Sequence, residues 1–373
     1  MRYAGRMIRA ASFLFALMTI AFVGACCSTP RVGAESARTG DEISVAGRRF
    51  HTGVPVVLWT DPGGYDGYRV DKRFAPLDES DWEHSKQGLQ SPNRYDSRAK
   101  DPALAEATRG GNWNLDQLRA NVDQIVLHYD ASGTSRQCFR TLHDSRGLSI
   151  HFMVDLDGTI YQTLDVKERA WHATKSNARS VGIEIANIGA YPSESPVLDK
   201  WYARDEGGLY VTLPPEVGNG GIQTPNFVAR PRRPDFVHGS IHDQQLLQAD
   251  FTPEQYRAIA GLLAALQSAL PEIPLDCPRD NDGRPLTRAL SDQEWTDFKG
   301  VLGHDHIQQN KIDPGPALDW DYLLESARQN HPVQAAASSN APPGNRQVMH
   351  RLCTTAPVLP GRSPPVPVPR EPV

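Results

Sequence analysis

The sequence gathers two histidines, a lysine and two aspartates in one short stretch near its carboxyl end. Residues 303–316 read Gly-His-Asp-His-Ile-Gln-Gln-Asn-Lys-Ile-Asp-Pro-Gly-Pro. A catalytic zinc ion takes three protein ligands and keeps one position open, and histidine and carboxylate side chains are suitable ligands. His304 and Asp313 are therefore candidate ligands, and the third must come from elsewhere in the chain. Lys311 can project toward the same cleft and stabilise an oxyanion there.

The third candidate ligand is His128, which ends the run Gln-Ile-Val-Leu-His of residues 124–128. Such apolar runs are typical of strands that are buried on both faces of a sheet. Open α/β sheets bind their ligands at the carboxyl ends of strands, where this histidine is expected. His306 could be a spare ligand, but we favour a position on the surface or behind the metal ligands, because His128, His304 and Asp313 already complete a three-ligand site.

Residues 180–187, Ser-Val-Gly-Ile-Glu-Ile-Ala-Asn, alternate strictly and predict another strand. Glu184 shares its face with Gly182 and Ala186, whose small side chains leave room for a group to reach the carboxylate. We interpret Glu184 as the base that takes a proton from water at the metal. The alternative is a structural ion pair with a nearby Arg or Lys.

The elements that must position these residues are predicted from periodicity and end signals. Asp-Leu-Asp-Gly between two apolar runs is a hairpin signal, and Thr-Pro-Glu-Gln at residue 252 is a helix start. Residues 189–250 carry many Pro, Gly and aromatic residues and are predicted to be a long loop region. The predicted elements are a strand at 56–59, a helix at 135–146, a hairpin of 150–154 with 159–164, and helices at 253–270 and 319–329.

Other histidines and the cysteines are assigned to structure. His151 is predicted to be packed in the hairpin, and His143 to lie on a helix surface. His238 and His242 have a spacing that is typical of metal ligands on a helix, but the intervening Gly-Ser argues against a helix. Cys138 and Cys277 could form a disulfide bond in an oxidising compartment, although we favour two buried free thiols.

The N-terminus has the features of a bacterial lipoprotein signal. Three arginines precede an apolar stretch at 10–23, and Val-Gly-Ala-Cys follows, so residues 1–25 would be removed and Cys26 lipidated. The apolar stretch is short for a membrane span; a plain secretory signal or an uncleaved anchor is the alternative. In a Gram-negative cell, Cys27 stands where inner-membrane lipoproteins usually carry aspartate. The expected location is therefore the outer membrane, facing the periplasm.

Five separated motifs resemble the type 2 N-acetylmuramoyl-L-alanine amidases, which share their fold with peptidoglycan recognition proteins. The resemblance covers about residues 120–325 and departs from the family in a long insertion and in His306, where aspartate is frequent. The motifs are Ile-Val-Leu-His-Tyr at 125–129, Ile-His-Phe-Met-Val-Asp-Leu-Asp-Gly-Thr-Ile-Tyr-Gln at 150–162, Ala-Trp-His-Ala at 170–173, Val-Gly-Ile-Glu-Ile-Ala-Asn at 181–187, and the stretch 303–316.

The resemblance implies an α/β fold with a central mixed β-sheet flanked by helices. It also implies a hydrolase that uses one catalytic Zn²⁺ to cut the amide bond between N-acetylmuramic acid and L-alanine. Position by position, His128, His304 and Asp313 match the family's zinc ligands. Glu184 and Lys311 match its catalytic carboxylate and lysine, and His172 matches a substrate-binding histidine of the cleft.

The expected chain has five parts, one of which is this catalytic domain. They are the signal peptide (1–25), a tether (26–45), an N-terminal extension packed on the catalytic domain (46–120), the catalytic domain (121–330, with an insertion at about 190–250), and a Pro-rich disordered tail (331–373). The expected partners are peptidoglycan or muropeptides, and a membrane through Cys26. A formal net charge of −5 without a long basic run argues against nucleic acid.

Two other functions remain open at this point. The domain could bind peptidoglycan without cutting it, although a binding module has no need for a full set of ligands together with Glu184 and Lys311. It could also hydrolyse another N-acylated peptide with the same residues. Muropeptide cleavage with and without a chelator separates these alternatives.

Overall fold

A computed structural model describes residues 30–76, 79–80, 95–192 and 195–330 of the chain. The segments predicted as signal peptide and Pro-rich tail, and the lipidation residue Cys26, lie outside the described residues. Within them, no helix is both long and apolar enough to cross a membrane.

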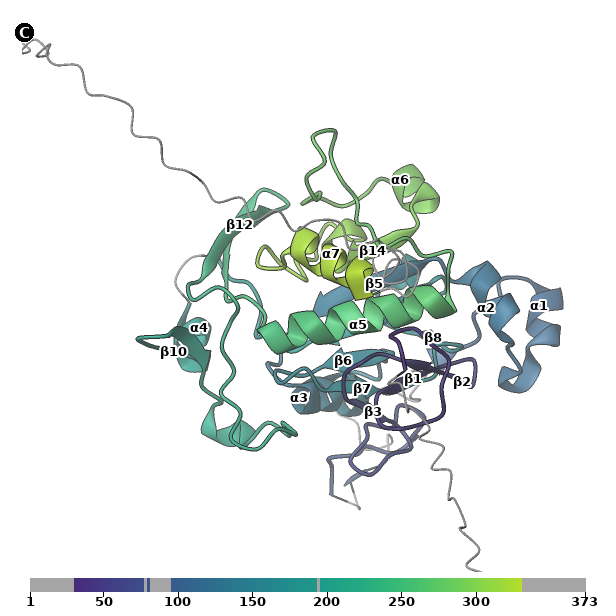
Figure 1. The fold of residues 1–373 in the computed structure, drawn as a ribbon, viewed down its shortest axis with the longest axis horizontal. Helices are drawn as coiled ribbons and strands as arrows, with labels where there is room; N and C mark the ends of the chain where they lie inside the picture. The colour runs from purple at the N-terminus through teal and green to yellow at the C-terminus, as the bar shows by residue number, and fades with distance from the viewer. Residues whose placement is uncertain (1–29, 77–78, 81–94, 193–194, 331–373) are drawn as a thin grey trace, which may run out of the picture.

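A six-stranded mixed β-sheet forms the centre of the fold (Figure 1), in the order β14-β5-β9-β6-β7-β3. The first four strands of this order are parallel, whereas β7 is antiparallel to β6 and β3 is parallel to β7. The α/β fold with a mixed sheet is thereby confirmed, as is the predicted hairpin of β6 and β7. The strands are β3 (Val56–Leu58), β5 (Gln124–Tyr129), β6 (Phe152–Val154), β7 (Ile160–Gln162), β9 (Ser180–Ile185) and β14 (Gly300–Gly303).

Two helices, α5 (Pro253–Ala269) and α7 (Trp320–Asn330), pack together on one face of the sheet (Figure 1). Alternate residues of β5 and β9, such as Leu127 and Ile183, join both helices in one apolar core. Thr252 and Gln255 form the predicted capping box at the start of α5. Because side chains alternate along a strand, His128 and Glu184 point to the opposite face. Near that face lie α3 (Ser135–Phe139) and the π-helical turn η3 (Arg140–Ser145).

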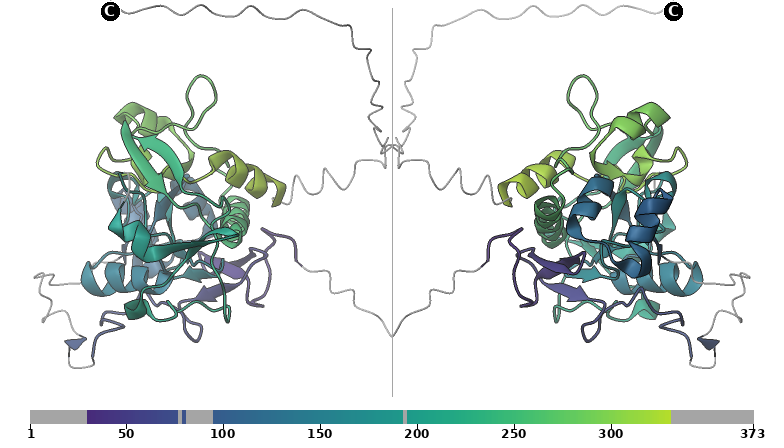
Figure 2. Two further views of the ribbon diagram at one scale, coloured as in Figure 1. Left: turned by 90° about the vertical axis from the view of Figure 1, so that its left-hand side faces the viewer. Right: turned by 90° about the vertical axis from the view of Figure 1, so that its right-hand side faces the viewer.

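The N-terminal segment contributes directly to the sheet, because β3 pairs with β7 at its edge. The β1–β2 hairpin, purple in Figure 2, packs against α5. A Cβ atom at Gly261 of α5 would lie 2.4 Å from the carbonyl oxygen of Thr52, so only glycine permits this contact. Further elements are β1 (Glu42–Val45), β2 (Arg48–His51), α1 (Pro102–Ala107), η2 (Arg109–Gly111), α2 (Leu115–Asn121), and β4 (Tyr95–Asp96), which pairs with β8 (Arg169–Ala170).

The region 189–250 is not one long loop, as the sequence predicted. Its strands have little alternation, as in Val-His-Gly-Ser-Ile paired with Gln-Gln-Leu-Leu-Gln. Contacts with the rest of the protein, such as the hydrogen bond from the Gln248 side chain to the carbonyl of Pro314, hold them in place. The region contains α4 (Pro196–Trp201), the hairpin of β10 (Tyr202–Asp205) with β11 (Gly208–Val211), η5 (Pro215–Val217), and the hairpin of β12 (Val237–Ile241) with β13 (Gln244–Gln248).

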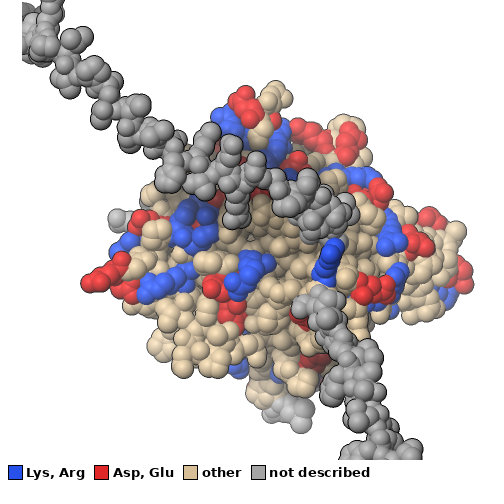
Figure 3. Space-filling model, viewed as in Figure 1, with Lys and Arg blue, Asp and Glu red and all other residues tan. Residues whose placement is uncertain are grey.

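Two further features concern the thiols and the surface. Cys138 and Cys277 are buried and free, so the disulfide alternative is wrong. On the face seen in Figure 3, Lys and Arg are intermixed with Asp and Glu.

We predict that Leu263→Ala lowers the free energy of unfolding by about 2–5 kcal/mol, because Leu263 of α5 is fully buried and its loss leaves a cavity. Urea denaturation measures the change. Arg257→Ala, at an exposed position of the same helix, is the control and should change stability by less than about 0.5 kcal/mol. Equal effects of the two substitutions would contradict the packing described for α5.

Candidate metal centre

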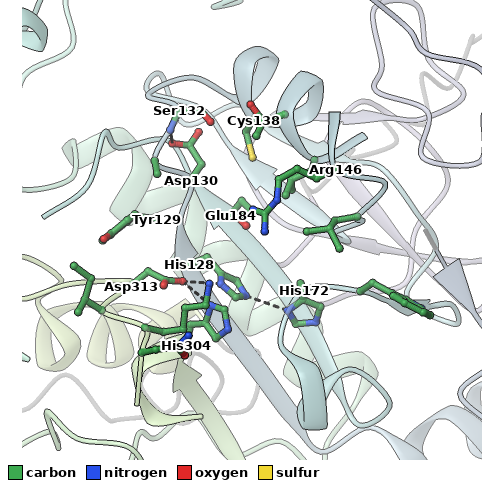
Figure 4. Close-up of a pocket in the computed structure, with 18 residues that line it drawn as sticks. His128, Tyr129, Asp130, Ser132, Cys138, Arg146, His172, Glu184, His304 and Asp313 are labelled. Atoms are coloured by element: carbon green, nitrogen blue, oxygen red, sulfur yellow. Dashed lines mark hydrogen bonds and ion pairs between the residues drawn. The ribbon is translucent and has the colours of Figure 1, made fainter. Parts of the chain in front are cut away.

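Three neighbouring strands deliver the candidate residues to one edge of the sheet. Gly303 of β14 pairs with Leu127 of β5, so His304, in η6 (His304–His306), follows beside His128. His128 in turn lies in register with Glu184 of β9. His128, Glu184 and His304 line a pocket of about 320 Å³ (Figure 4). His172, Lys311 and Asp313 line the same pocket. The structure thus brings all six site residues predicted from the sequence into one cavity.

The three candidate ligands place one atom each around a common point. Asp313 Oδ2 lies 2.8 Å from His128 Nδ1 and 3.0 Å from His304 Nδ1. All three side chains are nearly inaccessible to solvent.

A chain of hydrogen bonds determines which nitrogen of His128 carries its proton. Ser180 Oγ donates to the carbonyl of Ser176 at 2.7 Å and therefore accepts from His172 Nε2 at 3.3 Å. Burial, followed by the charge of His128, lowers the pKa of His172, so its imidazole is neutral and Nδ1 is an acceptor. His128 Nε2, 3.0 Å away, must then be the donor (Figure 4). The lone pair of neutral His128 is thus on Nδ1, facing Asp313.

The same logic applies to His304. Its Nε2 lies 2.8 Å from Gln308 Oε1, which can only accept, so Nε2 carries a proton and Nδ1 is the atom available to a metal ion. Nδ1 of both imidazoles and a carboxylate oxygen therefore lie around one point. Neighbouring ligand atoms of a tetrahedral zinc ion are ~3.3 Å apart, close to the separations of 2.8 and 3.0 Å between Asp313 Oδ2 and the two nitrogens. Among the described residues, His128, His304 and Asp313 form a group that fits a divalent cation. Hydrogen-bond partners orient both imidazoles, as is usual for metal ligands.

Glu184 lies beside this group without a partner of its own. Its Oε2 is buried and has no hydrogen-bond partner among the described residues, so the alternative of a structural ion pair is wrong. Burial, followed by the charges of Asp313 and Asp130, raises its pKa well above the ordinary value. The space over Gly182 is filled by the imidazole of His172, because a Cβ atom there would be 2.6 Å from His172 Nδ1.

Hydrogen bonds from the β12–β13 hairpin position the loop that carries Lys311 and Asp313. His242 Nε2 donates to the carbonyl of Lys311 at 2.9 Å. Gln248 bridges the Pro-Gly-Pro turn, donating to the carbonyl of Pro314 and accepting from the amide of Ala317. Gly315 has φ +84°, and a Cβ atom there would lie 2.2 Å from the Gln248 amide oxygen. The insertion therefore supports the site although it does not line the pocket.

The remaining histidines differ in their roles. His306 is fully buried, accepts from the Gly303 amide and donates to the Leu286 carbonyl, so it supports the loop and is not a ligand. His151 is packed, as predicted. His143 is not on a helix surface: it is 2% exposed and stacks on Phe139, because η3 turns it inward. His238 and His242 lie on a hairpin, so the helical metal pair is wrong.

A second group of metal-ligand residue types does not form a comparable site. Asp41, Glu42 and His51 lie close together in the N-terminal hairpin. The carboxylate of Glu42, however, accepts hydrogen bonds from the amide and hydroxyl of Thr39, both at 2.6 Å, and from the amide of Gly40. Hydrogens of the protein thus occupy the positions that a cation would need, and Glu42 is an anion held by its own turn.

The sequence itself assigns the chain to a known family. Residues 118–316, more than half of the chain, match the family described as N-acetylmuramoyl-L-alanine amidase. The chain belongs to this family. The type 2 amidase family expected from the five motifs is therefore confirmed, whereas the lipoprotein features are not tested by this match. No curated protein matches the chain.

Several solved structures are similar to the chain at low identity. The AmiD amidase of E. coli, in complex with anhydro-N-acetylmuramic acid-L-Ala-D-γ-Glu-L-Lys, is 20% identical over 55% of this chain and 57% of its own, with a TM-score of 0.31. The chain thus spans just over half of that protein. A selenomethionine derivative of AmpD is 16% identical over 70% and 98% of the chains (TM-score 0.30), and the endolysin LysCS of Clostridium intestinale URNW is 17% identical over 57% and 87% (TM-score 0.29).

Three residues of the site were not predicted from the sequence. Gln308 and Ser180 orient the imidazoles, and Arg146 lies beside Glu184 (Figure 4), where its charge opposes the effect of burial on the Glu184 pKa. Gln308 is four residues after His304, a spacing that a helical turn after the ligand could have suggested. The sequence has no comparable signal for Arg146, which follows a π-helical turn.

We predict that the protein binds one zinc ion per chain and that Asp313→Ala weakens binding by more than about 100-fold, because two neutral imidazoles alone do not neutralise the ion. Metal analysis after equilibrium dialysis measures both. His238→Ala, which removes an exposed histidine outside the cluster, should retain full binding. Unchanged zinc content in the Asp313 variant would rule out the assigned ligand set.

Proposed function

We propose that this protein is a zinc-dependent hydrolase that cuts the amide bond between N-acetylmuramic acid and L-alanine in peptidoglycan or muropeptides. Membership of the amidase family supports the reaction class. The observation that carries the zinc dependence and the mechanism is the pocket itself: three converging ligand atoms lie beside the buried carboxylate of Glu184, whose Oε2 has no hydrogen-bond partner among the described residues. A module that only binds peptidoglycan would have no use for this combination.

The ion would be held by His128, His304 and Asp313. When bound there, zinc lowers the pKa of water and polarises a carbonyl group. Glu184 supplies the base for the water that attacks the amide carbon. Burial, followed by the charges of Asp313 and Asp130, raises its pKa, which makes it a stronger base than an exposed carboxylate. The proton it takes is then available for the amine of the departing L-alanine.

Lys311 supplies positive charge where the carbonyl oxygen becomes an anion. It lines the same pocket as Glu184, and its charge opposes the effect of burial on the pKa of Glu184, so its ammonium group lies within electrostatic reach of the centre. A fixed cation in a pocket that excludes water stabilises a developing oxyanion strongly. His172, which we expected to bind substrate, also orients the imidazole of His128, because it accepts a hydrogen bond from His128 Nε2.

We also propose that the enzyme works at the cell envelope, attached through a lipid on Cys26 to the outer membrane and facing the periplasm. The basic residues, apolar stretch and Val-Gly-Ala-Cys pattern of residues 2–26 support this location. Mass spectrometry of the mature N-terminus tests it, and an unmodified Cys26 would contradict it.

We predict that the purified protein releases free stem peptide from a muropeptide, for which the anhydro compound present in the AmiD structure is a suitable choice. Chelation should stop the release and added zinc should restore it. Chromatography of the products measures both. Tight binding without release would identify a binding module, and inertness toward muropeptides would favour another N-acylated substrate.

Glu184→Gln should lower kcat by about 10²–10⁴-fold, because the amide cannot take the proton of water. Zinc content should equal that of the wild type, since Glu184 is not among the ligands. Kinetics and metal analysis of the same preparation make the distinction. A variant with wild-type kcat would exclude Glu184 as the base.

Lys311→Met should lower kcat by about 10²-fold with less effect on zinc affinity, because the variant keeps the ligands and loses the charge near the oxyanion. Lys299→Met is the matched control, since Lys299 is an exposed lysine that pairs with Glu272. Equal activity of the two variants would show that Lys311 has no part in the reaction.

A further inference from the structure

The side chain of Arg98 is fully buried, yet no carboxylate of the described residues forms an ion pair with it. Burial lowers the pKa of Arg98 to about 9, so its guanidinium remains a cation at neutral pH. A buried charge is costly unless hydrogen bonds satisfy it. Arg98 also lies outside the residues that match the amidase family, in the N-terminal segment whose strand β4 pairs with β8.

The guanidinium is satisfied by four carbonyl groups of one segment. Nε donates to Val166 at 2.9 Å, Nη1 to Asn177 and Ala178 at 3.3 and 3.1 Å, and Nη2 to Ser180 at 2.9 Å. These carbonyls come from the two ends of residues 166–180, so Arg98 holds the ends of the segment together. A planar guanidinium with five N–H groups can do this, whereas a lysine ammonium has only three.

His151 connects the same region to the strand of the catalytic base. Its Nδ1 accepts from the Gly182 amide at 3.0 Å, so its Nε2 carries the proton and donates to the Glu168 carbonyl at 2.9 Å. Burial, followed by the charge of Arg98, lowers the pKa of His151 to about 3 and keeps it neutral. Nη2 of Arg98 approaches this nitrogen to 2.9 Å, a close contact between two donors rather than a hydrogen bond.

The segment held by Arg98 is the one that positions His172. Asn177, whose carbonyl accepts from Arg98, uses its side-chain oxygen to accept from the His172 amide at 3.1 Å. Ser180, whose carbonyl also accepts from Arg98, uses its hydroxyl to accept from His172 Nε2. His172 Nδ1 then accepts from His128. Two of the four anchored residues therefore hold the histidine that directs the lone pair of His128 toward the metal position.

We propose that Arg98 is a positioning residue of the metal centre, which acts through Asn177, Ser180 and His172 to orient His128 for the ion. The proposal rests on the zinc site of the proposed function, but it concerns metal affinity and is tested without substrate. Failure of muropeptide cleavage in the wild type would therefore contradict the proposed function and leave this test intact.

The experiment compares the zinc Kd of the full-length apo-protein and its variants by competition with a chromophoric chelator. Arg98→Ala should bind zinc about 10–100-fold more weakly, the usual effect of losing a group that orients a metal ligand. Arg98→Lys should be intermediate, because an ammonium reaches fewer of the four carbonyls. The control is Leu118→Ala, which removes a fully buried side chain from α2. This variant should have a lower Tm and an unchanged zinc Kd.

A double variant distinguishes this route from general destabilisation. If Arg98 acts through His172, the Arg98→Ala/His172→Ala protein should bind zinc within about two-fold of His172→Ala alone, because interacting positions are not additive. Additive losses, or an Arg98→Ala protein whose Kd is within two-fold of the wild type, would overturn the proposal. If Arg98→Ala does not fold, Arg98→Lys takes its place and should bind zinc at least five-fold more weakly than the wild type. A smaller loss in Arg98→Lys would overturn the proposal.

Discussion

The site depends on the convergence of three lone pairs at one point. Asp313 Oδ2 lies 2.8 Å from His128 Nδ1 and 3.0 Å from His304 Nδ1, and each imidazole has a hydrogen-bond partner at its other nitrogen. All three groups would attract a divalent cation at this point, and burial would strengthen the attraction because the local dielectric is low. The fold brings the groups together from elements that are distant in sequence, so binding of the ion would stabilise the folded state.

The architecture explains how these elements meet. Parallel strands β14, β5 and β9 all end at the same edge, and their register places His304, His128 and Glu184 side by side. The opposite face of the strands belongs to the core with α5 and α7, which fixes the orientation of the sheet. The N-terminal segment and the insertion each approach from outside. The first holds the segment of His172 through Arg98, and the second holds the loop of Lys311 through His242.

Much of this could be predicted from the sequence, because local chemistry specified it. The apolar run before His128, the alternation around Glu184 and the Asp-Gly turn after Val154 each correspond to the observed strand or hairpin. What was missed depends on tertiary contacts. β14 is only four residues long, and Arg98 stands in a polar stretch without periodicity. The β12–β13 hairpin has polar strands, and its packing against the turn after Asp313 stabilises it.

Asp130 is the other pocket carboxylate whose pKa is raised, to about 8, so a raised pKa alone does not identify the base. Its Oδ1 accepts hydrogen bonds from the amides of Ser132, Gly133 and Asn187, which ties the strand ends of β5 and β9 together. Asp130 Oδ2, like Glu184 Oε2, is buried and has no hydrogen-bond partner among the described residues, so a free oxygen does not separate the two groups either. They differ in their surroundings: three backbone amides hold the Asp130 carboxylate in place, whereas Glu184 lies in register with the candidate ligand His128. The position beside the three candidate ligands therefore favours Glu184 as the base and a structural role for Asp130.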